Sequence, residues 1–355
     1  MENYQWQTAQ LPYACPPLPP KLKEKTERRT LLKASNHAFL MPLLLTLFSV
    51  IIAGIAGGVW GFMHAGEIAQ FMETGGIKAI QDFLLSHRDQ LVLLVIPATA
   101  AAVLVTILSC KPILRRKIFS AWKRPYIHAS DFFLWAVIMF GGSTIGSFIV
   151  DALHAAFGPL GFHTQQPDFS LTGSQGADIV LILYVCLIGP VLEETLFRGM
   201  ILQSLRPWGD WFAVIVSSII FGLSHLNIAQ CIPVIMVGIV LGFAAVKAES
   251  VFPSMLLHII NNTAAIVITV SGAGTNQAAN KALEAVGIAL AAAAVLLIIL
   301  RREDIRHVIA RHQPLPPEKH KYRVVFLQSV SFWILAAVFV YFCFAANKSA
   351  SAVSI

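Results

Sequence analysis

Apolar residues gather along the chain in nine long segments separated by short polar stretches. Most of these segments approach the roughly 20 apolar residues that cross a bilayer core as an α-helix. The pattern therefore predicts an all-α polytopic membrane protein with about nine transmembrane helices. Residues 66–88 have the mixed pattern of an amphipathic or re-entrant stretch. The nine segments are residues 39–60, 91–110, 132–150, 177–205, 211–227, 230–246, 252–271, 282–300 and 325–346.

The composition excludes most alternatives to a membrane protein. Of the 355 residues, 56% are hydrophobic and only 13% are charged, and the mean hydropathy is +0.70. An ordinary soluble domain has roughly 25% charged residues. A disordered chain has low hydrophobicity and high charge, which is the opposite of this composition. The five cysteines include no pair at C-x-x-C spacing, and the chain is too long and too poor in Cys for a disulfide-stapled module.

The Lys and Arg residues predict which helix ends face the cytoplasm. With the N-terminus inside and nine spans in strict alternation, 21 of the 26 basic residues fall in inner segments, four fall in outer segments, and Arg198 lies within a span. This distribution follows the positive-inside rule. It predicts a cytoplasmic N-terminus and an external C-terminus. It also explains the net charge of +7 without nucleic acid as a partner.

The segments divide the chain into four parts. Residues 1–36 are a basic, Pro-rich cytoplasmic arm that we expect to be a mobile tail, with no cleavable signal peptide. Residues 37–176 are N-terminal membrane helices, residues 177–271 are a helical core that holds the candidate functional residues, and residues 272–355 are C-terminal membrane helices.

The fourth apolar segment carries charges that are rare in a membrane helix, in the sequence GPVLEETLFRG. Each charge at the centre of such a helix costs about 2.5 to 3.5 kcal/mol on insertion scales. Glu194 and Arg198 are i, i+4 neighbours and are predicted to form an ion pair. Glu193 lies about 100° away around the helix, and without that partner it suits the role of a general base. The alternative is that all three residues form a buried ion cluster that only fixes helix packing.

Two histidines and an asparagine form the second part of the pattern. His225 follows a Phe by four residues at the end of the fifth segment, and His258 precedes Asn262 by four residues in the seventh. Each pair therefore shares one helix face. Counting helical rise from the predicted cytoplasmic ends places Glu193, His225 and His258 roughly 16 to 20 Å deep, so they can share one level. Asn261 points away from this face, and we expect it to be a bystander.

The three motifs Glu-Glu-x-x-x-Arg, Phe-x-x-x-His and His-x-x-x-Asn, in this order, resemble those of the CPBP family. This family contains the type II CAAX prenyl endopeptidases and their prokaryotic relatives, some of them implicated in bacteriocin self-immunity. The resemblance covers roughly residues 180–265. It implies an intramembrane endopeptidase in which Glu193 and His225 activate water and His258 and Asn262 stabilise the oxyanion. Residues Glu194 and Arg198 complete the candidate catalytic set.

Whether a metal takes part is a separate question. Glu193, His225 and His258 have the chemistry of a His₂Glu zinc site with an open position for water, and Glu194 would then be the candidate base. The chain has no H-E-x-x-H sequence, which would place two ligands and the base on one rigid turn. The sequence therefore favours the mechanism without a cofactor and leaves zinc as the alternative.

Two other classes of function remain open at the level of sequence. A membrane carrier also places Glu, Arg and His within spans, often beside a helix break such as Gly189-Pro190. A non-enzymatic immunity or assembly protein can use a protease scaffold to hold a partner. For the endopeptidase we expect a membrane-associated protein or peptide as substrate, prenylated only if the host makes such proteins. We expect an integral protein of a prokaryotic cell membrane, and the sequence does not indicate its oligomeric state.

Overall fold

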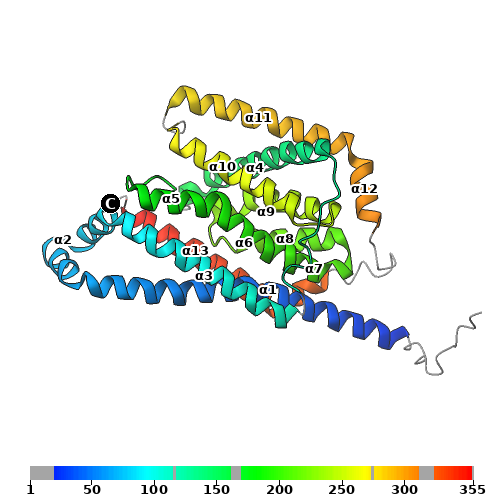
Figure 1. Cartoon of the computed structure of the whole chain (residues 1–355), viewed down its shortest axis with the longest axis horizontal. Helices are drawn as coiled ribbons and strands as arrows, with labels where there is room; N and C mark the ends of the chain where they lie inside the picture. Colours follow the sequence, from blue (N-terminus) through cyan, green and yellow to red (C-terminus); the bar gives the residue numbers. More distant parts are fainter. Residues whose placement is uncertain (1–19, 115–116, 161–168, 273–275, 312–323, 354–355) are drawn as a thin grey trace, which may run out of the picture.

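The computed structural model describes residues 20–114, 117–160, 169–272, 276–311 and 324–353, which form helices and short connections without a β-strand. Figure 1 shows most of the helices running along the long axis of a bundle. The helices are α1 (Pro20–Met63), α2 (Ala65–Ser86), α3 (Arg88–Leu114), α4 (Ala129–Phe157), α5 (Gln175–Leu183), α6 (Gly189–Leu196), α7 (Leu202–Leu205), α8 (Asp210–Leu223), α9 (Ile228–Lys247), α10 (Phe252–Val270), α11 (Gln277–Leu300), α12 (Arg302–Arg311) and α13 (Val330–Val353). Two π-helical turns, η2 (Tyr184–Ile188) and η3 (Phe197–Ile201), flank α6, and two 3₁₀ turns, η1 (Gly158–Leu160) and η4 (Arg206–Trp208), follow α4 and α7.

The helices confirm the predicted all-α membrane architecture. Within the described ranges, seven helical stretches are long and apolar enough to cross a membrane, and two shorter apolar stretches, Asp210–Leu223 and Val330–Ala345, accompany them. Each of the nine predicted apolar segments coincides with one of these stretches. Many large apolar side chains outside the bundle core are exposed, and along α11 only Ala294 is buried. A bilayer is the solvent that such a surface requires.

Two sequence predictions differ from the structure at the ends of helices. The prediction of a mobile arm is wrong for residues 20–36, because α1 begins at Pro20 and continues without a break into the membrane segment. Proline suits this first position, since its missing N–H would have no partner there. The first 19 residues lie outside the described part. The fifth segment was predicted to reach residue 227, but α8 ends at Leu223.

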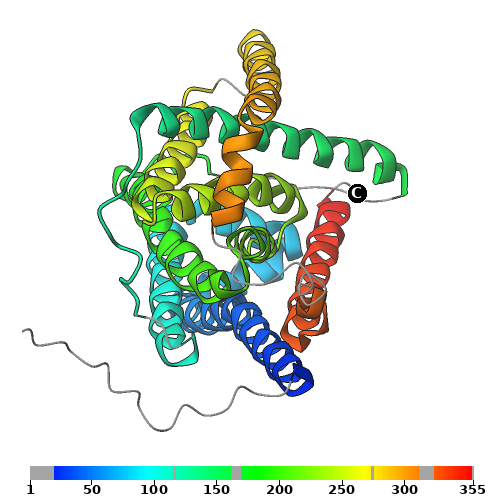
Figure 2. The ribbon, with the colours of Figure 1, turned by 90° about the vertical axis from the view of Figure 1, so that its right-hand side faces the viewer.

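The two ends of the described chain lie at opposite ends of the bundle. In Figure 1, α1 begins at the right and α13 ends at the left, beside α2. Figures 1 and 2 together show α11 on one side of the bundle and α1 on the other. Contacts link α11 to α4, α4 to α9, and α9 to α8. The segments that carry the candidate residues therefore lie in the interior of the bundle.

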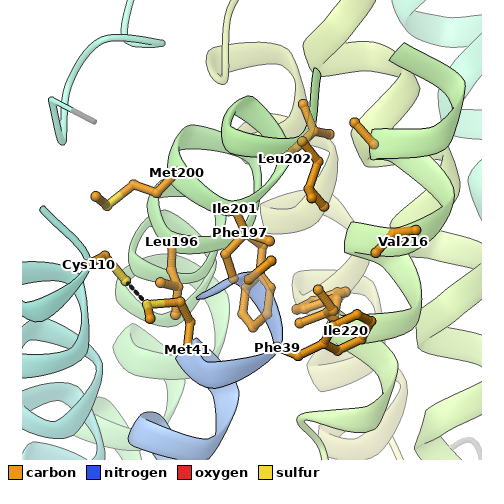
Figure 3. Close-up of a cluster of buried hydrophobic side chains, with 14 of the residues drawn as sticks. Phe39, Met41, Cys110, Leu196, Phe197, Met200, Ile201, Leu202, Val216 and Ile220 are labelled. Atoms are coloured by element: carbon orange, nitrogen blue, oxygen red, sulfur yellow. Dashed lines mark hydrogen bonds between the residues drawn. The ribbon is translucent and has the colours of Figure 1, made fainter. Parts of the chain in front are cut away.

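The largest apolar core fixes the polar segment of the chain against the N-terminal helices. Figure 3 shows Phe39 and Met41 of α1 beside Phe197 and Ile220, from η3 and α8. The Sγ atom of Cys110 on α3 lies 2.8 Å from Sδ of Met41. Phe39, Met41 and Cys110 are fully buried, as is most of η3. This packing places the segment of the Glu-Glu motif against α1 and α3 on one side.

Candidate active site

The Glu-Glu motif lies on α6, a helix of two turns between the two π-helical turns η2 and η3. Gly189 and Pro190 open α6, and proline is tolerated in the first turn of a helix because the N–H that it lacks would have no partner there. A Cβ atom at Gly189 would lie 3.0 Å from the carbonyl oxygen of Tyr184. Single π turns occur frequently at functional sites because they re-aim the side chains beside them. Here both glutamates lie on the short helix between two such turns.

Glu194 and Arg198 form a completely buried ion pair, as their spacing predicts. The Nη1 atom of Arg198 donates to Oε1 of Glu194 at 2.7 Å, and both side chains have 0% exposure. Arg198 also donates through Nη2 to the carbonyl oxygen of Gly238 at 3.2 Å, and its guanidinium lies 4.3 Å from the ring centroid of Phe221. Gly238 permits this approach, since a Cβ there would lie 3.2 Å from Nη2. The pair thereby ties α6 and η3 to α8 and α9.

His258 lies between the two glutamates. Its Nδ1 atom is 3.0 Å from Oε1 of Glu194, and its Nε2 atom is 3.8 Å from Oε2 of Glu193. The Glu194 carboxylate thus contacts both Arg198 and Nδ1 of His258, and Nε2 of the same imidazole faces Glu193. Glu193 differs from its neighbour in exposure, with 26% against 0%. Of the two carboxylates, Glu193 is therefore the one that a substrate or water can reach.

His225 lies beyond the last residue of α8, in the tight turn that leads to α9. Its Nδ1 atom is 2.9 Å from the carbonyl oxygen of Phe221, so Nε2 is the ring nitrogen left for other contacts. The backbone of Leu226 has φ of +52°, and the Asn227 side chain caps α9 by accepting from the amide of Ala229 at 2.8 Å. A non-glycine residue with positive φ is strained, and such strain clusters at functional sites.

The Phe of the Phe-x-x-x-His motif connects the two histidines. The ring centroid of Phe221 is 5.1 Å from that of His225 and 5.7 Å from that of His258, both in edge-to-face geometry. Phe221 is almost completely buried and also carries the guanidinium of Arg198 on its face. One aromatic ring thus fixes the relative positions of three of the predicted site residues.

Asn262 lies one turn after His258 and bonds in another direction. Its Nδ2 atom donates to the carbonyl oxygen of Val185 in η2 at 3.0 Å. Asn261, predicted to be a bystander, donates to Oδ1 of Asn262 at 3.2 Å and so orients that amide. The π turn before α6 therefore supplies the carbonyl that positions Asn262.

The structure joins the predicted residues in two steps. Glu193, Glu194, Arg198 and His258 form one contact network, His225 is connected to it through the ring of Phe221, and Asn262 is connected through η2. The carbonyl groups of Gly238 and Val185 were not among the predicted site groups. Backbone acceptors leave no side-chain signal in a sequence, and only the small size of Gly238 pointed to a close approach.

The fit of a metal to these residues can be tested on their geometry. Among the residues with described placement, no group of three or more His, Cys, Asp or Glu side chains is arranged to hold a metal ion. His258 uses Nδ1 for Glu194, and Glu193 and His258 face each other at 3.8 Å. A zinc site formed by Glu193, His225 and His258 remains a prediction, and no step of the mechanism proposed below passes through a metal.

Comparison with known proteins agrees with the resemblance in the motifs. Residues 175–264 match the family model described as "Type II CAAX prenyl endopeptidase Rce1-like". A Bacillus subtilis (strain 168) protein named "Putative membrane peptidase YdiL" is 23% identical over 136 residues, 38% of this chain and 55% of its own length. An Escherichia coli protein named "Uncharacterized 24.3 kDa protein" is 28% identical over 88 residues, 23% of this chain and 41% of its own length. The chain thus spans about half the length of these relatives. No solved structure matches it.

Proposed function

We propose that this integral membrane protein is an endopeptidase that hydrolyses a peptide bond of a membrane-associated protein or peptide. The observation that carries the proposal is the unequal environment of the two adjacent glutamates. Glu194 is buried and bound by Arg198 and His258, whereas Glu193 is partly exposed and faces Nε2 of His258. Two neighbouring carboxylates with separate roles are typical of acid–base catalysis. The family match over residues 175–264 supports the same reaction.

In the proposed mechanism, Glu193 and His225 activate the attacking water. Nδ1 of His225 contacts the carbonyl oxygen of Phe221, so Nε2 is the ring nitrogen available to the water. Water attacks the scissile carbonyl carbon, its proton passes to Glu193, and the C=O electrons become the oxyanion. When the C–N bond breaks, that proton passes to the leaving amine. The other products are the new carboxyl group and the regenerated glutamate.

His258 and Asn262 stabilise the oxyanion in this proposal. The amide of Asn262 has two N–H groups, and the carbonyl of Val185 accepts from one of them. Nδ1 of His258 contacts Glu194, so Nε2, which faces Glu193, is the ring nitrogen that would contact the oxyanion. Loss of one oxyanion donor typically lowers the rate by about 10² to 10³. Glu194 and Arg198 serve as positioning residues, because they hold His258 without facing the reacting atoms.

The experiment that tests the function is detection of cleavage products by mass spectrometry. The full chain is reconstituted in vesicles of a prokaryotic lipid extract together with membrane-anchored peptides, with and without prolonged chelation. The glutamate mechanism predicts internal peptide cleavage that survives chelation and disappears in Glu193→Ala. Activity lost on chelation and restored by zinc would instead support the zinc alternative. A folded wild-type protein that cleaves no peptide of the panel would favour a carrier or scaffold.

A further inference from the structure

A cavity of about 580 Å³ lies at the end of the bundle where α1 begins, away from the Glu-Glu motif. Its walls come from residues 26–37 of α1, the last residues of α3, and the segment α7–η4. The α1 wall contributes Arg29, Lys33 and His37, which follow each other at i, i+4 spacing and therefore share one helix face. None of the described residues that line the cavity is acidic.

The two strongest cations of this cavity are available for a ligand. The side chains of Arg29 and Lys33 are exposed, and in the described part of the chain neither forms an ion pair. Nearby arginines differ in this respect. Arg28 donates to Gln328 at 2.9 Å, and Arg206 is bound by Asp210 at 2.8 Å and by Glu249 at 2.7 Å. Among the residues that the structure describes, the cavity lining thus has positive charge and no acidic side chain.

Part of the lining of the same cavity is apolar. Ile113 and Leu114 from α3 and Trp208 from η4 line it, and all three also pack against the main hydrophobic core. Tryptophan is enriched where helices leave the membrane, because its ring is apolar and its N–H is polar. A cavity lined by both basic and apolar residues fits an amphiphile with an anionic headgroup.

We propose that this cavity binds the headgroup of an anionic phospholipid from the cytoplasmic leaflet. The positive-inside distribution predicts that the start of α1 faces the cytoplasm, and the anionic lipids of that leaflet concentrate on basic pockets between helices. The phosphate pairs with Arg29 and Lys33, and the acyl chains leave along the apolar wall. Because α7 and η4 continue from the segment of the Glu-Glu motif, the lipid would bridge α1 and the candidate catalytic helix. The proposal does not depend on the endopeptidase function.

The test compares the association of spin-labelled phosphatidylglycerol and phosphatidylcholine with the full chain in vesicles. We expect the wild type to prefer phosphatidylglycerol. The double variant Arg29→Gln/Lys33→Gln should lose roughly fivefold in that preference for each removed charge. The matched control Lys78→Gln/Lys281→Gln removes two exposed cations from segments predicted to lie outside, and it should keep the wild-type preference.

Three results would contradict the lipid site. The first is an unchanged preference in the cavity variant, and the second is an equal loss in the control. The third is displacement of the labelled lipid by free glycerol phosphate at concentrations that saturate a phosphate site. A phospholipid in the proposed site is also held by its acyl chains, so a headgroup alone should not displace it. Circular dichroism of both variants in the same vesicles verifies that the helices remain folded, so a lost preference reports the site itself.

Discussion

Two adjacent glutamates acquire different roles because the protein surrounds them differently. The Glu194 carboxylate accepts from Arg198 at 2.7 Å and from His258 at 3.0 Å, in a fully buried position. Glu193 has no contact as short, and its nearest basic atom among the described residues is Nε2 of His258 at 3.8 Å. A carboxylate locked by two donors cannot exchange a proton with water easily, whereas its exposed neighbour can.

Loss of the Glu194 side chain should therefore lower the stability of the folded protein. Glu194→Ala leaves Arg198 charged and unpaired inside the bundle, which typically destabilises a protein by about 3 to 5 kcal/mol. The thermal unfolding midpoint in detergent should fall accordingly. Glu284→Ala, which removes an exposed carboxylate from α11, is the matched control and should change stability by less than about 0.5 kcal/mol. Equal midpoints for the two variants would refute the structural role of the ion pair.

The residue pattern predicted contacts within one helix better than contacts between helices. The Glu194–Arg198 pair follows directly from i, i+4 spacing. The bond from His258 to Glu194 joins residues 64 positions apart and depends on how α10 packs against α6. Spacing along a chain contains no information on that packing. The contact from Asn261 to Asn262 was missed for another reason, because side chains of adjacent residues normally do not face each other on a helix.

At the scale of elements, α8 and its turn determine the position of His225. A helix of 14 residues is about 21 Å long, less than the roughly 30 Å of a hydrocarbon core. If Asp210 lies at the cytoplasmic surface, the turn with His225 lies within the membrane. Gly222 permits α8 and α9 to approach at this point, because an added Cβ would lie 2.7 Å from the carbonyl oxygen of Cys231.

Substitution of Gly222 should separate these two helices. Gly222→Ala forces the backbone of α9 away, and such overpacking typically costs about 1 to 3 kcal/mol. The unfolding midpoint should fall, and cleavage should fall with it, because His225 is three residues away. Gly58→Ala in α1 meets no atom within 4 Å and should behave like the wild type, which makes it the matched control. A Gly222→Ala protein as stable as the Gly58→Ala protein would argue against the close approach.

Hydropathy predicted the existence of the helices and missed their irregular turns. All nine apolar segments are helical, because a membrane span must satisfy its backbone hydrogen bonds internally. The π turns before and after α6 depend on one extra residue per turn, and no change in the apolar period marks them. The Gly-Pro pair was the sole sign of a break in this segment.

For the whole molecule, the arrangement of the helices agrees with an odd number of crossings. The start of α1 and the end of α13 lie at opposite ends of the bundle (Figure 1). Basic residues predict that the start of α1 faces the cytoplasm. The arm that precedes the first apolar segment was expected to be mobile, but hydropathy alone could not show that residues 20–36 extend the first helix.

This orientation can be measured with reporters at two positions. A reporter enzyme that works only in the cytoplasm should be active when it is fused after Lys321. A reporter enzyme that works only outside should be active when it is fused after Ile355, because α13 lies between the two positions. Accessibility of single introduced cysteines to a membrane-impermeant reagent provides an independent control. Two reporters on the same side would show that α13 does not cross the membrane.

Turnover by the Glu193→Gln variant tests most directly whether Glu193 accepts the proton of the reacting water. The amide has nearly the same shape as the carboxylate but cannot accept the proton, and loss of a general base typically lowers the rate at least 10²-fold. Cleavage of a reconstituted membrane peptide should therefore fall below about one hundredth of the wild-type rate, while the unfolding midpoint stays unchanged. A folded Glu193→Gln protein that retains more than about a tenth of wild-type turnover would contradict the account.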